Sequence, residues 1–129
     1  LDGVAAALAV PFLQEKHFKE MEFYVESIEL AINSENFAMY HKMQESFHEV
    51  YLNLCPNESL VNLLNQLKKK FLLRFDHLES IEFAQQKLRE TNKEHREIIT
   101  LFKRQDCKGL EKYLKEVHWD VKKAELVLL

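Results

Sequence analysis

The sequence predicts an all-α protein, an antiparallel bundle of six or seven helices. Only two glycines and two prolines occur among the 129 residues, so few positions interrupt a helix. Apolar residues recur every three or four positions along most of the chain, which is the period of an α-helix, and no segment alternates as a strand would. The length suits one domain, and 47% hydrophobic with 30% charged residues is an ordinary globular balance.

Composition also limits the function and the compartment. The formal net charge of −3 gives no general reason to expect nucleic-acid binding. Cys55 and Cys107 show no CxxC spacing, so we expect free thiols and a reducing compartment. The apolar start LDGVAAALAVPFL contains Asp2 and Pro11, lacks a preceding basic region, and falls short of the roughly 20 apolar residues of a membrane span. We therefore expect a soluble, cytoplasmic protein that does not enter the membrane.

The first half of the chain divides into three predicted helices. A helix over residues 2–13 is kinked or ended by Pro11, and a second covers residues 15–32. Ser34 is then the expected N-cap of a third helix, which stops before Pro56. The residues expected to face the core are Val4, Leu8 and Phe12 in the first helix, Phe18, Met21, Val25, Ile28 and Ile32 in the second, and Phe37, Tyr40, His41, Gln44, Phe47, His48, Tyr51 and Leu54 in the third.

The second half contains three or four more predicted helices. A fourth starts near Asn57, and a fifth segment covers residues 81–90. Thr91 and Glu94 have the spacing of a capping box, so we expect a helix to restart there. The last helix begins near Cys107. The inward residues are Leu60, Leu63, Leu64, Leu67, Phe71, Arg74, Phe75 and Leu78, then His95, Ile98, Ile99 and Phe102, and finally Leu110, Tyr113, Leu114, Val117, His118 and Val121.

Three histidines lie where the helical pattern expects apolar residues. His48, His95 and His118 each fall on the inward stripe of a different predicted helix. An unpaired buried polar group costs roughly 1–3 kcal/mol, so each imidazole must be hydrogen-bonded, bound to a metal, or beside a wet cavity. Imidazoles from three helices of a bundle can converge on one divalent ion. The alternative is a hydrogen-bonded polar cavity that holds no ion.

The two segments that carry these histidines, QESFHEVYLNLCPNESLVNLLNQL and TNKEHREIITLFKRQDCKGLEKYLKEVHWDV, resemble the effector-binding FCD domain of GntR-family transcription regulators of the FadR subfamily. That family has approximately the pattern D-x-x-F-H, a turn with Asn before Leu, E-H-R-x-I, a short turn with Asp, and a final His. The opening LDGVAAALAV is similar to the first helix of the family's effector domain, so the resemblance spans nearly the whole chain. The matching positions are Phe47, His48, Asn57, Glu94, His95, Arg96, Ile98, Asp106 and His118.

The resemblance implies that residues 1–129 form an effector-binding and dimerisation domain for a small organic acid or similar metabolite. In the family, the signal passes to an N-terminal winged helix-turn-helix that binds DNA. The sequence contains no such segment and begins at Leu1 in mid-pattern, so we expect a truncated chain that acts on DNA only through a missing N-terminal domain. A homodimer is implied by the family and favoured by the aromatic residues Phe83 and Trp119, which we expect to be exposed.

The resemblance also implies a metal site made of three histidines and one carboxylate. The family's aspartate, one turn before the first histidine, is Gln44 here. An amide oxygen carries no charge, so Gln44 is at best a weak fourth ligand beside His48, His95 and His118. Imidazole suits several divalent ions, of which zinc is the first choice and nickel or manganese are alternatives.

A cation held by three imidazoles would have open positions for a carboxylate effector. Arg74 lies on an otherwise apolar stripe and could add a bidentate contact, although its stem could equally pack while its head reaches solvent. His41 shares a face with Gln44 and could line the cavity. We do not expect an enzyme, because no general base, paired Glu-x-x-His motif or activated nucleophile is evident. A metal-dependent enzyme and a ligand-free helical dimerisation module are the competing classes.

Overall fold

The computed structural model of the protein describes residues 2–68 and 80–118, and all regular structure in these residues is helical. The predicted all-α bundle is therefore confirmed. Its elements are α1 (Asp2–Ala9), the short 3-10 helix η1 (Val10–Phe12), α2 (Glu15–Asn33), α3 (Phe37–Leu52), α4 (Glu58–Lys68), α5 (Ile81–Lys103), α6 (Cys107–Tyr113) and the π-helical turn η3 (Leu114–His118).

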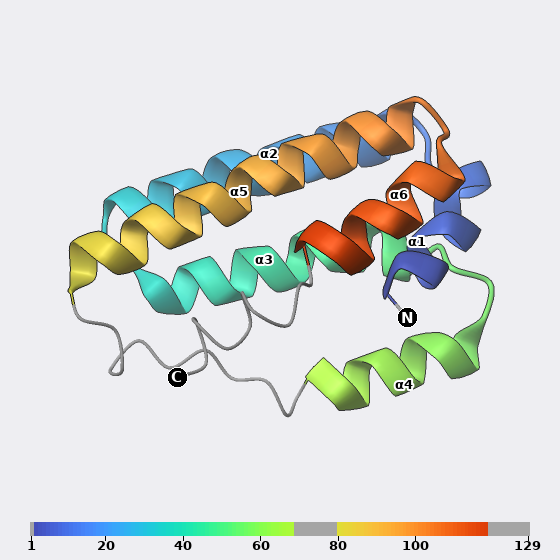
Figure 1. Ribbon diagram of the computed structural model, residues 1–129, viewed down its shortest axis with the longest axis horizontal. Helices are drawn as coiled ribbons and strands as arrows, with labels where there is room; N and C mark the ends of the chain where they lie inside the picture. The colour runs from blue at the N-terminus through green and yellow to red at the C-terminus, as the bar shows by residue number, and fades with distance from the viewer. Residues whose placement is uncertain (1, 69–79, 119–129) are drawn as a thin grey trace.

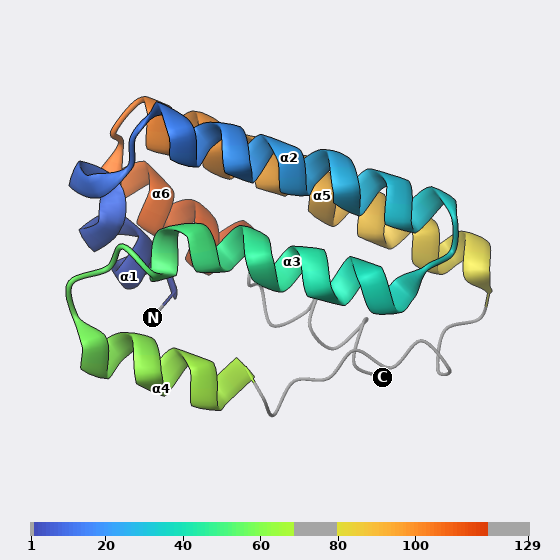
Figure 2. The same ribbon diagram turned by 180° about the vertical axis from the view of Figure 1, so that it is seen from behind.

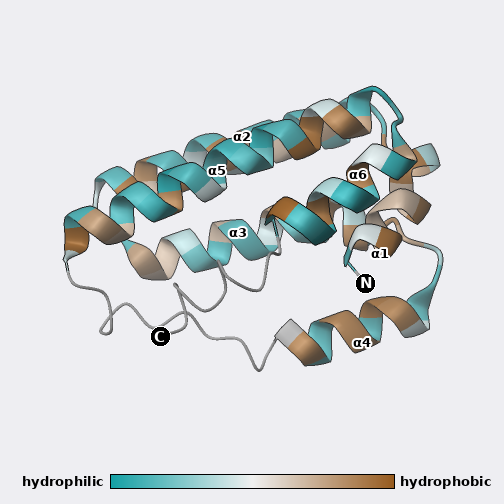
Figure 3. Cartoon of the chain, viewed as in Figure 1, coloured by the Kyte–Doolittle hydropathy of each residue, from teal (hydrophilic) through white to brown (hydrophobic). Residues whose placement is uncertain are grey.

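The long helices α2, α3 and α5 form the body of the bundle. Helix α2 packs against both α3 and α5 and runs antiparallel to each of them (Figures 1 and 2). Helix α1 packs against α6 near one end of the body, with smaller contacts to α3 and α4. The apolar side of each long helix faces its neighbours, while the outer sides of α2 and α5 are largely hydrophilic (Figure 3). This arrangement brings α3, α5 and η3 together.

The core consists of two groups of buried apolar side chains. The larger group joins α1, α2, α3, α4, α5 and α6, and the smaller one joins the other ends of α2, α3 and α5. The predicted inward positions of α2 are largely confirmed, since Met21, Val25, Ile28 and Ile32 are all buried and Phe18 is half-buried. The smaller group contains Ile28, Ala31, Ile32, Tyr40 and Leu88.

The cap of α3 differs from the sequence prediction. Asn36, not Ser34, is the N-cap, and its side-chain oxygen accepts a hydrogen bond from the Met39 amide at 3.1 Å. The Ser34 hydroxyl instead donates to the Leu30 carbonyl at 2.8 Å and so belongs to the end of α2. Glu35, between them, has a φ of 58°, a left-handed conformation that ends one helix and redirects the chain. The turn between α2 and α3 is therefore longer than predicted, and α3 begins two residues later.

Helix α5 does not restart at Thr91, so the predicted capping box is wrong. The helix is continuous from Ile81 to Lys103, and the Thr91 hydroxyl donates to the Lys87 carbonyl one turn earlier at 3.1 Å. Leu88 and Asn92 continue one buried face through this point, so packing along the whole helix outweighs the local capping signal. The Glu94 side chain does not turn back to Thr91; it contacts His118 instead.

Helix α1 buries a different face from the one predicted. Val4, Leu8 and Phe12 are 39%, 40% and 50% exposed. The buried residues are Ala5, Ala6 and Ala9, together with Gly3 and Val10. Gly3 lies directly against the backbone of Glu111 in α6. Because small side chains let two helix backbones approach closely, α1 turns its alanines inward and leaves its larger apolar residues outside.

Several other expected positions also change. Leu63 and Val117 are exposed, whereas Leu64, Leu110 and Leu114 are buried as predicted. Val117 lies in the π-helical turn, which has more residues per turn than an α-helix, so Val117 falls on a different face from the one an α-helix would give it. Phe83 is half-buried rather than exposed, and the Lys87 ammonium lies 5.5 Å from its ring centre. Phe71, Arg74, Phe75, Leu78, Trp119 and Val121 lie outside the described residues.

The cysteines and the helices also bear on two expectations drawn from composition. Both cysteines are free thiols, as predicted, with Cys55 buried and Cys107 exposed. Among the helices described, none combines the length and apolar character needed to cross a lipid bilayer.

The close approach of α1 and α6 makes a testable prediction. In Gly3→Ala, the added Cβ would lie 2.7 Å from the Glu111 carbonyl oxygen, a backbone atom that cannot move without shifting α6. We expect a loss of about 1–2 kcal/mol in the free energy of unfolding, because overpacking outweighs the gain in helix propensity. Urea denaturation followed by circular dichroism would measure it.

The control for this prediction is Val4→Ala in the same helix. Val4 is exposed, so its truncation should change the unfolding free energy by less than about 0.5 kcal/mol. A Gly3→Ala protein as stable as the Val4→Ala protein would show that α1 does not depend on this approach.

Candidate metal centre

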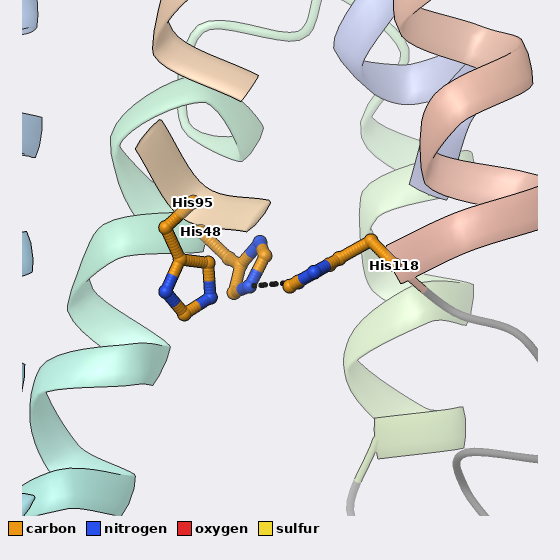
Figure 4. Close-up of side chains that lie close together, drawn as sticks. All are labelled: His48, His95 and His118. Atoms are coloured by element: carbon orange, nitrogen blue, oxygen red, sulfur yellow. Dashed lines mark hydrogen bonds between the residues drawn. The ribbon is translucent and has the colours of Figure 1, made fainter. Parts of the chain in front are cut away.

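Three imidazoles from three elements meet inside the bundle. His48 comes from α3, His95 from α5 and His118 from the end of η3, as Figure 4 shows. Their side chains are almost completely buried, with 2%, 0% and 5% of the residue surface exposed. The three ring centres are 4.9 to 5.3 Å apart, and one ring nitrogen from each residue lies within 4.8 Å of the other two. The sequence-predicted cluster is therefore assembled by the fold.

His48 is oriented by a chain of two hydrogen bonds. Its Nδ1 atom lies 2.7 Å from the Tyr51 hydroxyl, one helical turn along α3. That hydroxyl donates its proton to Asp2 Oδ2 in α1, also at 2.7 Å. Because the phenol proton points to Asp2, the phenol oxygen is the acceptor for His48, which must carry its proton on Nδ1. The lone pair of His48 is then on Nε2.

His95 is oriented in the same sense by Asn92, one turn earlier in α5. The amide nitrogen of Asn92 donates to the Val25 carbonyl at 3.1 Å and to Glu29 Oε2 at 3.0 Å, which fixes the direction of the amide. Its oxygen lies 3.0 Å from His95 Nδ1 and accepts that N–H. The Nε2 atom of His95 is buried and has no hydrogen-bond partner within the described residues. It is the polar atom of the cluster that most requires a ligand.

His118 is held by a carboxylate. Its Nδ1 atom lies 3.1 Å from Glu94 Oε1, and the Glu94 residue is itself only 9% exposed. An ionised carboxylate only accepts hydrogen bonds, so His118 donates from Nδ1 and presents Nε2 to the cluster. This Nε2 is 3.2 Å from Nε2 of His48 (Figure 4). All three imidazoles thus turn their lone-pair nitrogen to the same small volume.

Such an arrangement fits a divalent cation. Two nitrogens bound tetrahedrally to one zinc ion, each at roughly 2.0–2.1 Å, are about 3.3 Å apart, close to the 3.2 Å between His48 and His118. Histidines that ligate metals usually donate their other ring N–H to a carboxylate or another acceptor, as all three do here. His95 Nε2, which has no hydrogen-bond partner among residues 2–68 and 80–118, would gain one. The same distances also fit a cluster without a cation, in which His118 carries a proton on both ring nitrogens and donates to Glu94 and to His48.

Burial also sets the protonation states in and beside the cluster. It lowers the pKa of His95 well below its usual value, and the neighbouring His118 lowers it further, so His95 is neutral. Burial and the adjacent Asp2 carboxylate raise the pKa of Tyr51 well above its usual value, so the phenol keeps its proton. The pKa of His41, a half-buried residue, is lowered by burial and raised less strongly by Glu45.

The other residues expected at the site have different positions. Gln44 is half-buried on α3 one turn before His48, and its side-chain oxygen is buried with no hydrogen-bond partner within the described residues. His41 contacts the Tyr40 ring edge to face, with ring centres 5.5 Å apart, and is not one of the three clustered histidines. Arg74 lies outside the described residues.

Sequence reasoning missed the residues that orient the histidines. Tyr51 follows His48 by three positions and Asn92 precedes His95 by three, so both were visible as neighbours one turn away. Glu94 was noted for the capping box and as a match to the family pattern, but not as the residue that holds His118. The role of Asp2 could not be predicted, because no local sequence pattern relates it to Tyr51, which lies 49 positions later in the chain.

Comparison with known proteins identifies the family. The sequence model of the FCD domain matches residues 1–118 of this chain. Since the match covers most of the chain, the protein belongs to the FCD domain family, whose members are regulatory, effector-binding domains typical of GntR-family regulators. No curated protein and no solved structure matches the chain. The predicted family is confirmed, and the FadR subfamily stays a prediction.

The buried His95 makes a prediction for chelator-treated protein. His95 stays neutral in the fold because its pKa is lowered, whereas in the unfolded chain it takes up a proton near pH 6.5. Below that pH the unfolded state binds more protons, so stability should fall as pH drops from about 6.5 to 5.5, by up to about 1.4 kcal/mol per pH unit for one such group. Urea denaturation at several pH values would measure this slope.

The matched control is His95→Gln, which removes the titrating group and keeps a polar side chain. Its slope over the same pH interval should be smaller. Equal slopes in the two proteins would mean that His95 does not contribute to the acid sensitivity.

Proposed function

We propose that this domain binds a divalent cation through His48, His95 and His118 and senses a small carboxylate metabolite at that cation. The observation that supports the proposal is the shared orientation of the three imidazoles. Each uses Nδ1 to reach an acceptor, so three Nε2 lone pairs point to one buried volume. A bound cation would supply a concentrated positive charge with open positions for an anionic oxygen.

Zinc is the first choice for the cation, and nickel or manganese are alternatives, because imidazole accepts several divalent ions and supply often decides among them. Three neutral imidazoles leave the charge of the cation uncompensated by its direct ligands. Gln44 would add only a neutral oxygen, as a weak fourth ligand. An effector carboxylate would therefore be favoured electrostatically, since a buried charge is costly without a partner of opposite sign.

The proposal extends to the whole regulator. We propose a homodimeric, cytoplasmic transcription regulator of the GntR family and FadR subfamily, in which this domain senses the metabolite and a winged helix-turn-helix in another part of the protein binds DNA. FCD membership supports the sensing role. Arg74 and His41 are the proposed additional contacts to the effector, and neither is needed to hold the cation.

Removal of one imidazole tests the metal site. His95→Ala should weaken zinc binding by more than about a hundredfold, because a direct ligand is expected to matter more than the residues behind it, whose loss costs 10- to 100-fold. Protein purified without a metal-affinity step would be examined by native mass spectrometry with elemental analysis, followed by zinc titration. Unchanged metal content and melting temperature in His95→Ala would leave the cluster as a metal-free polar cavity, with a proton on His118.

Two further variants sharpen this experiment. His17→Ala removes an imidazole that caps α2, where its Nδ1 accepts from the Gln14 amide at 2.9 Å, and zinc affinity should not change. Gln44→Asp should strengthen zinc binding, because it places an anionic oxygen one turn before His48. An unaltered affinity in Gln44→Asp would remove Gln44 from the proposed ligand set.

Effector binding makes a separate prediction. Small mono-, di- and tricarboxylates would be titrated by calorimetry into zinc-loaded and chelator-treated protein. At least one class should bind the zinc-loaded form about tenfold or more tightly, a difference of about 1.4 kcal/mol. Equal affinity for the two forms would mean that the carboxylate does not bind at the cation, and no binding to either form would argue against a carboxylate effector.

A further inference from the structure

Helix α1 is tied to the histidine cluster by a buried polar chain. Asp2 lies in the first turn of α1, is only 7% exposed, and accepts the Tyr51 hydroxyl proton at 2.7 Å. Tyr51 is completely buried and is the acceptor for His48 Nδ1 at 2.7 Å. Two short hydrogen bonds thus connect α1 to a proposed metal ligand on α3. The connection spans 49 positions in sequence and crosses between helices.

An acidic residue at the start of a helix usually lies in solvent, and Asp2 does not. An acidic residue in the first turn is stabilised by the helix dipole while it remains in water. Asp2 is buried instead, where a carboxylate is costly unless hydrogen bonds or opposite charge compensate it. The short bond from Tyr51 is part of that compensation, so the burial of Asp2 depends on where the phenol is held, and the phenol is held in part by His48.

We propose that Tyr51 and Asp2 are positioning residues that couple occupancy of the three-histidine site to the docking of α1. The proposal rests on the proposed cation site. A cation at Nε2 withdraws electron density from the His48 ring, which makes the Nδ1–H a stronger donor to Tyr51 and in turn strengthens the bond from Tyr51 to Asp2. The positive charge also favours the buried Asp2 carboxylate across the chain.

The coupling must act in both directions. If cation binding favours docked α1, then docked α1 favours cation binding by the same free energy. In the docked state Gly3 lies directly against the backbone of Glu111 in α6, and the alanines of α1 are completely buried. The end of α1 that carries Asp2 therefore responds to occupancy of the three-histidine site.

Hydrogen exchange of the whole 129-residue chain, with and without zinc, tests the coupling. In the unaltered protein, zinc should slow exchange in the peptides of α3 and α5 and also in the peptide of α1 and η1. In Tyr51→Phe, the slowing in α1 should be lost while that in α3 and α5 remains, and zinc affinity should fall about tenfold. Asp2→Ala, at the edge of the fold, should likewise abolish the zinc effect on α1.

The matched control is Tyr40→Phe, a buried tyrosine on the same helix in the smaller core group. In Tyr40→Phe, zinc should still slow exchange in α1. A general loss of packing lowers the stability of the zinc-free and the zinc-bound protein alike, so the difference in exchange between them stays the same. If the unaltered protein binds no zinc, the proposed cation site fails and the coupling with it. If zinc binds tightly but Tyr51→Phe retains the slowing in α1, the coupling is overturned and the cation site stands.

Discussion

Three imidazoles lie in the centre of a bundle whose other buried side chains are mostly apolar, and each has to place an N–H on an acceptor. They do so with the same ring atom, Nδ1, on a phenol, an amide and a carboxylate oxygen. Once these bonds are made, the positions of the three Nε2 atoms are no longer free. The cluster is therefore oriented by its surroundings before any ligand arrives, which lowers the entropic cost of binding one.

Each imidazole is also connected to a carboxylate on a different helix. Glu94 contacts His118 directly, Glu29 is reached from His95 through an amide, and Asp2 is reached from His48 through a phenol. Charge attraction is stronger inside a protein than in water, so three carboxylates that are bonded to the imidazoles directly or through one side chain favour positive charge at the cluster. The cation proposed for this site would join α1, α2, α3, α5 and η3 through these bonds, and its removal would loosen all of them together.

Most of the fold could be predicted from periodicity, and the exceptions have physical causes. The stripe of α2 was correct because Met21, Val25, Ile28 and Ile32 recur at intervals of three or four residues, which gathers them on one face of the helix. The face of α1 was wrong because Gly3 and the alanines, not Val4 and Leu8, match the close backbone of α6. Thr91 was assigned to a helix start because capping signals are local, whereas the continuity of α5 depends on packing along its full length.

The sequence by itself determined which histidines face inward, because burial follows the helical period, and it indicated the family through the order of its motifs. Tertiary structure decided what those histidines do to one another. Tyr51 and Asn92 lie one turn from their histidines, but whether such neighbours bond depends on rotamers that packing selects. The pairing of Asp2 with Tyr51 depends on contacts between elements far apart in the chain. Helical periodicity carries no information on such contacts, because it records only the direction in which each side chain points.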